Sequence, residues 1–88
     1  MKSTSTILDE AKEIIYGDRE KTYGAPSKNL NLIASLWSDY LKQAVTAQDV
    51  CMMMILLKVA RQSNGYTRDN LVDICGYAAL NSRVEDAT

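Results

Sequence analysis

The residues best suited to chemistry in this sequence lie in three places along the chain. The first is an irregular segment, residues 17–26, which holds two glycines, a proline and a run of charged side chains. Within it, cationic, hydroxyl and aromatic residues follow one another: Arg19, Lys21, Thr22 and Tyr23. Basic side chains, a hydroxyl and backbone amides freed by glycine bind phosphate, and a tyrosine can stack on a base. We expect this segment to bind a phosphorylated ligand; the alternative is a solvated connector whose charges pair with one another.

The other two places fall in the second half of the chain. Lys58 and Arg61 follow an apolar run and, being three residues apart, share one face of a helix. Asn70, Asp73 and Tyr77 form a polar stripe at spacing i, i+3 and i+7. In an antiparallel hairpin the two sets face each other. The two cations would then neutralise phosphate, Asn70 and Asp73 would bind a base edge or a ribose, and Tyr77 would form a wall.

A structural interpretation of the same residues stays open. In it, Lys58 or Arg61 forms a salt bridge with Asp69 or Asp73 and closes this end of the domain. The two interpretations are compatible, because an ion pair can open when a phosphate arrives.

An enzymatic interpretation is the second alternative. All-α nucleoside triphosphate pyrophosphohydrolases hold magnesium with an E-x-x-E pair and an E-x-x-D pair, and residues 69–77 resemble the second pair with Asn70 in place of its first acid. The only acidic group at comparable spacing is Asp9, Glu10 and Glu13. One aspartate and one asparagine offer too few oxygen ligands for Mg²⁺. We therefore expect binding without hydrolysis, and neither a metal nor a cofactor.

The composition excludes several functional classes. The absence of histidine removes His-based zinc sites and Ser-His-Asp or Cys-His catalysis. Ten basic and eleven acidic residues lack the basic excess of a duplex nucleic-acid binder. Cys51 and Cys75 have no metal or redox spacing, so we expect two buried thiols in a reducing cytoplasm. The longest apolar run, residues 50–57, is too short to span a membrane, and no signal peptide is evident.

Helices must position these residues. Apolar spacing predicts one all-α, four-helix domain over residues 1–88, with helices at about 6–16, 27–44, 46–64 and 67–83. Ser27 is a plausible N-cap of the second helix, and Thr46 with Asp49 predicts a capping box for the third. The third helix is apolar on all sides over residues 50–57, more than one face can bury. We expect an oligomeric helical bundle, a homodimer or homotetramer joined through this helix; a host protein is the alternative partner.

Three blocks of the sequence, residues 18–24, 56–61 and 69–80, together resemble a known family. It comprises small phage and prophage proteins of about this length, is catalogued as a domain of unknown function, and is distantly similar to the phage nucleotide-modification-associated domain. The resemblance covers residues 7–84 and implies a helical, nucleotide-handling protein of the host-cell cytoplasm. Because several phage proteins of this size are nucleotide sponges, we predict that the chain sequesters a cyclic dinucleotide or related immune second messenger, an anti-CBASS role. The ligand set implied by position is Arg19, Lys21, Thr22, Tyr23, Lys58, Arg61, Asn70, Asp73 and Tyr77.

Overall fold

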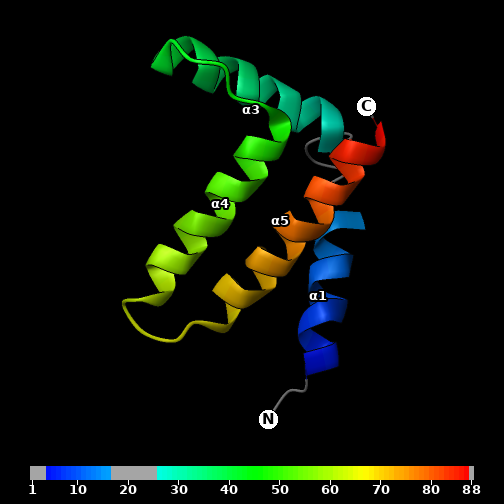
Figure 1. The fold of residues 1–88 in the computed structure, drawn as a ribbon. Coiled ribbons are helices and arrows are strands. Elements are labelled where there is room, and N and C mark those ends of the chain that lie inside the picture. Colours follow the sequence, from blue (N-terminus) through cyan, green and yellow to red (C-terminus); the bar gives the residue numbers. More distant parts are fainter. Residues whose placement is uncertain (1–3, 17–25, 88) are drawn as a thin grey trace.

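The described part of the chain consists of helices and the short turns that join them. The computed structural model describes residues 4–16 and 26–87, and these ranges contain no strand. Their helices are α1 (Thr4–Tyr16), α3 (Pro26–Leu41), α4 (Ala47–Gln62) and α5 (Arg68–Ala87) (Figure 1). The prediction of an all-α fold with four helices is therefore confirmed over the described residues. None of these helices combines the length and apolar character needed to cross a membrane.

The four helices form an open arrangement. α4 and α5 make an antiparallel hairpin, α1 lies along the other side of α5, and α3 crosses one end of the hairpin and extends beyond it (Figure 1). Among these helices, the backbone of α1 lies close to that of α5 but not to that of α3 or α4. The Cα radius of gyration is 13.6 Å, whereas roughly 12 Å is typical of a compact chain of this length. The single chain is thus not a closed four-helix bundle.

The buried core lies where all four helices approach one another. Ile15 of α1 contributes to it, together with residues of α3, α4 and α5: Leu30, Ala34, Ala47, Val50, Cys51, Leu80 and Val84. Away from this region several large apolar side chains are exposed, including Tyr40 and Leu41 at the end of α3. Cys75, expected to be buried, is only half-buried, whereas Cys51 is fully buried. Because α3 crosses only one end of the hairpin, it does not cover the apolar residues in the second half of α4, such as Leu56 and Val59.

Most of the predicted helix boundaries are close to the observed ones, but α5 runs to Ala87, four residues past its predicted end, and α3 differs at both ends. It begins at Pro26, a residue suited to the first helical position because it has no N–H to leave unpaired. Ser27 is therefore inside the helix and is not its N-cap. α3 ends at Leu41, three residues before the predicted end. Lys42 there has a φ of 57°, and the Gln43 amide donates to the Ser38 carbonyl at 3.2 Å, the pattern of a Schellman C-cap.

The turn into α4 is the best-defined helix boundary. Thr46 accepts a hydrogen bond from the Asp49 amide at 3.1 Å, and the Asp49 carboxylate accepts one from the Thr46 amide at 2.9 Å. The predicted capping box is therefore confirmed. Just before it, the Ser38 hydroxyl accepts from the Val45 amide at 2.8 Å and donates to the Val45 carbonyl at 3.2 Å. These bonds hold the connection against the end of α3.

Candidate functional site

Two of the predicted site residues, Lys58 of α4 and Asp73 of α5, meet where these two helices pack against each other, a contact region called here the α4–α5 seam. The Lys58 ammonium and the Asp73 carboxylate lie 3.0 Å apart, and their side chains are only 13% and 20% exposed. The antiparallel hairpin places them opposite each other, as the sequence predicts, and their ion pair is the one anticipated by the structural interpretation. A charge pair removed from water stabilises little beyond an apolar pair of the same volume. The pair therefore keeps a cation and a carboxylate at the seam without a large gain in stability.

Asn70 lies one turn of α5 before Asp73 and has a structural partner. Its side-chain amide donates to the Gln62 side-chain oxygen at 3.0 Å, and the Thr67 amide donates to the same oxygen at 3.1 Å. Asn70 is only 7% exposed. Gln62 thus closes the end of the hairpin by accepting from both residues. The sequence reasoning missed Gln62, although its place in the last turn of α4 could have indicated such a role.

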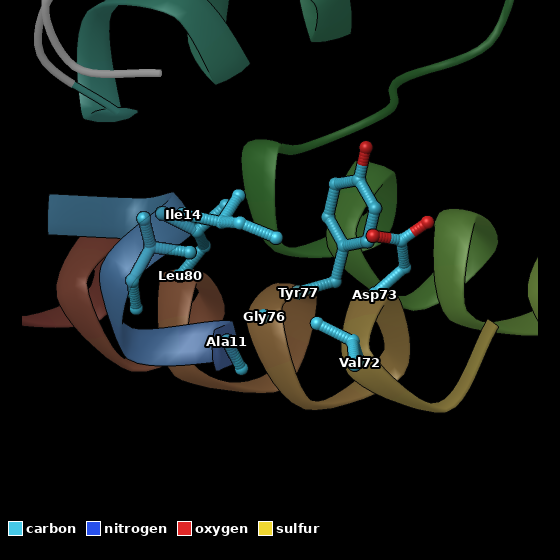
Figure 2. A pocket seen from close by; sticks show the side chains of 8 residues that line it. Ala11, Ile14, Val72, Asp73, Gly76, Tyr77 and Leu80 are labelled. Carbon is cyan, nitrogen blue, oxygen red and sulfur yellow. The ribbon is translucent and has the colours of Figure 1, made fainter. Parts of the chain in front are cut away.

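Tyr77 and Asp73 border a small hollow between α1 and α5. Figure 2 shows the tyrosine ring and the carboxylate rising together from neighbouring turns of α5, with Ile14 and Leu80 farther along the hollow. Its volume is about 10 Å³, roughly the space for one water molecule. A nucleotide does not fit into this hollow, so Asp73 and Tyr77 would contact a nucleotide only at the surface of the protein.

The polar stripe of α5 continues to Asn81. Its side-chain amide points to the Met52 sulfur of α4 at 3.9 Å, a weak contact. The side-chain oxygen of Asn81 is buried and has no hydrogen-bond partner among the residues described. A buried polar atom without a partner is uncommon. The seam therefore carries polar groups along its length, from Asn70 to Asn81.

Of the remaining predicted ligand residues, the structure describes only Arg61. Arg61 is exposed, one turn of α4 beyond Lys58, and forms no ion pair within the described ranges. The four residues of the connector lie outside the residues that the structure describes: Arg19, Lys21, Thr22 and Tyr23. Their predicted convergence with the two cations of α4 is therefore untested.

A second ion pair, which the sequence reasoning also missed, links α1 to α5. The Arg68 guanidinium contacts the Glu10 carboxylate, with side chains 25% and 38% exposed. Its hydrogen bond to Glu10 raises the pKa of Arg68 above the ordinary value. Glu10 belongs to the acidic group considered for metal binding, and here it has a cationic partner. Within residues 4–16 and 26–87, no group of three His, Cys, Asp or Glu side chains is placed to hold a metal ion.

Comparison with known proteins defines the class to which this chain belongs. Residues 6–85 match the family described as Domain of unknown function (DUF6378). The chain is therefore a member of this family. No solved structure matches the chain.

Two curated relatives are phage proteins. The Gene 55 protein of Mycobacterium phage D29 is 43% identical over 82 residues, which cover 92% of this chain and 54% of that protein. The Gene 55 protein of Mycobacterium phage L5 is 47% identical over 83 residues, which cover 91% of this chain and 53% of that protein. The predicted resemblance to a phage family of unknown function is thus confirmed. The chain spans about half the length of these curated relatives, so the expectation that family members have about its own length is wrong for them.

Proposed function

We propose that this chain binds a nucleotide at the α4–α5 seam and holds it without turning it over. The observation that carries the proposal is the largely buried Lys58–Asp73 pair, 3.0 Å apart. An ammonium group is a common phosphate ligand, and a carboxylate accepts hydrogen bonds from sugar hydroxyls or base amino groups. A cation for the phosphate and an acceptor for the sugar or base are thus adjacent at one place in the seam.

The ligand would enter by exchange. A phosphate competes with Asp73 for Lys58, and the released carboxylate then accepts a hydrogen bond from the sugar or the base. Arg61, exposed one turn farther along α4, supplies a second cation with a planar, bidentate geometry. Tyr77 lies beside Asp73 as an aromatic wall, and the unpartnered oxygen of Asn81 is a further acceptor in the same seam. The connector residues Arg19, Lys21, Thr22 and Tyr23 complete the proposed set, and Asn70 contributes if it exchanges its bond to Gln62.

We infer the biological role from the curated relatives of this chain. Its curated relatives are phage proteins, and a phage gains from removing nucleotide signals that activate bacterial immunity. The ligand we propose is a cyclic dinucleotide or a related second messenger, sequestered intact. Balanced charge, with ten basic and eleven acidic residues, suits a small anionic ligand better than a nucleic-acid duplex.

Thermal-shift screening against cyclic dinucleotides and nucleoside triphosphates, with and without Mg²⁺, tests this proposal. A ligand that binds only the folded state raises the melting temperature. We expect a shift with at least one nucleotide and recovery of that nucleotide intact by chromatography after denaturation. Recovery of a cleaved product would identify a hydrolase instead, and no shift with any nucleotide would contradict the proposal.

Arg61→Ala is the sharpest variant for this site, because the side chain is exposed and its loss leaves the fold in place. Removing a charge-assisted phosphate contact weakens binding by roughly 10- to 100-fold. Lys12→Ala, which removes an exposed cation of α1, is the matched control and retains full affinity. Equal affinity of the two variants would exclude Arg61 from the site.

A further inference from the structure

The surface of α4 that α3 and α5 leave uncovered is apolar and exposed. Met52, Leu56 and Val59 form a ridge on it and are 50%, 63% and 50% exposed. Met53 and Leu57 flank the ridge, each 40% exposed. The spacing of four and then three residues places the ridge on one side of the helix, the arrangement of a helix-pairing seam.

A groove adjoins this ridge at its amino-terminal half. It is an open, apolar hollow of about 470 Å³, lined by Trp37, Tyr40 and Leu41 of α3 and by Met53 of α4. α3 overhangs only this end of α4 (Figure 1). The groove thus occupies one end of the face, and the end around Val59 lies outside it.

We propose that this face binds a second copy of the chain, with the two α4 helices antiparallel across a twofold axis near Leu56. In this arrangement residue 53 of one copy lies opposite residue 59 of the other. The half of each α4 around Val59 then lies over the half of its partner that carries the groove. A parallel arrangement would instead set groove against groove and leave the halves around Val59 without a complementary surface. An interface that uses the same patch on both copies must be self-complementary in this way.

The exposed area agrees with what a dimer requires. Seven large apolar side chains of α4 and the end of α3 are between 40% and 87% exposed. Full burial of one such side chain corresponds to roughly 60–120 Å², so together they expose on the order of 400 Å² of apolar surface. A stable interface buries about 800 Å² per partner, a little more than half of it non-polar. These side chains alone thus supply most of the apolar part of a standard interface.

Charge also favours a second copy as the occupant. Residues 50–57 of α4 carry no charge, and Asp49, the one charged residue in line with the ridge, is engaged with Thr46 in the capping box. The face therefore offers no charged group by which a partner of different sequence would be selected. The identical apolar face of a second copy can pack against it without any matching of charges.

Light scattering during gel filtration, with the matched variants Leu56→Glu and Leu8→Glu, tests the proposal. Leu8 is 55% exposed on α1, away from this face, and Leu56 is 63% exposed at its centre. We expect a dimer for the unmodified chain and for Leu8→Glu. Leu56→Glu places a carboxylate in the apolar contact of both copies and weakens the dimer by roughly 100-fold or more. A monomeric unmodified chain, as expected if another protein occupies the face, or a Leu56→Glu variant that stays dimeric, would overturn the proposal.

Trp37 gives a readout that needs no variant. It is the only tryptophan of the chain, and it lines the groove. Dilution through the dissociation constant should shift its emission to longer wavelength as the groove becomes hydrated, with helical circular dichroism unchanged. Emission that is constant over the whole concentration range in which the mass changes would overturn the proposed position of the interface.

Discussion

Lys58 and Asp73 show how one pair of side chains can serve both fold and function. Their distance of 3.0 Å and low exposure make the pair a structural link between α4 and α5. Because the pair is largely buried, removing one partner is unfavourable: the remaining charge would be shielded from water and would have no ion-pair partner. A ligand that brings its own phosphate and hydroxyl groups could satisfy both partners separately.

Thermodynamic coupling between these two residues is the first prediction. We expect Lys58→Met to lower the free energy of unfolding by about 1–3 kcal/mol, less than for a fully buried pair because both groups keep some contact with water. The double variant Lys58→Met with Asp73→Leu should recover most of that loss, because no charge is left unpaired. Urea unfolding of the two single variants and the double variant measures the coupling. Losses that simply add would show that the pair is not coupled.

Different reactivity of the two cysteines is the second prediction. Cys51 is fully buried, and burial raises the pKa of its thiol, so little of it is the reactive thiolate at neutral pH. Cys75 is half-buried. We expect Ellman's reagent to modify Cys75 in the native protein and Cys51 only after unfolding in denaturant. Equal rates for both thiols in the native state would contradict the observed core.

At the scale of the helices, local sequence signals account for the boundaries that were predicted well. The Thr46–Asp49 capping box is a property of four consecutive residues, so its sequence is sufficient to predict it. The end of α3 was missed because Lys42 takes the left-handed conformation that usually indicates glycine. The Lys58–Asp73 contact followed from the hairpin, whereas Glu10–Arg68 joins α1 to α5 and depends on tertiary packing that no local pattern encodes.

Opposite effects of alanine at two glycines form the third prediction. Gly76 lies in the middle of α5, and a Cβ there would meet the Ile15 Cγ2 at 3.6 Å, an ordinary contact. Gly76→Ala should therefore raise the free energy of unfolding by about 0.5–1 kcal/mol through helix propensity. Gly65 has a φ of +133°, which an L side chain rarely adopts, so Gly65→Ala should destabilise by about 1–3 kcal/mol. Thermal and urea unfolding measure both changes. Destabilisation by Gly76→Ala would mean that α1 and α5 cannot adjust to the added methyl group.

The whole molecule is less compact than its length allows, and this openness connects the two proposals. The apolar run of α4 that the sequence predicted to need cover from several sides is covered only in part by α3 and α5: Val50 and Cys51 are buried, whereas Leu56 is 63% exposed. The sequence could indicate the lack of cover but not its position, because the crossing of α3 over one end of the hairpin depends on the whole fold. The seam and the apolar face meet only at Met52, which contacts Asn81. Ligand binding and self-association can therefore be separated by variants at Arg61 and Leu56.

Native mass spectrometry of the protein mixed with a panel of cyclic dinucleotides tests the central claim, nucleotide binding at the seam, most directly. We predict a complex whose mass includes an intact nucleotide, and a much lower fraction of protein carrying that nucleotide in Arg61→Ala, with the subunit number unchanged. A monomer carrying a nucleotide would contradict the dimer alone. Protein without bound nucleotide under every condition, at whatever subunit number, would contradict the proposed function.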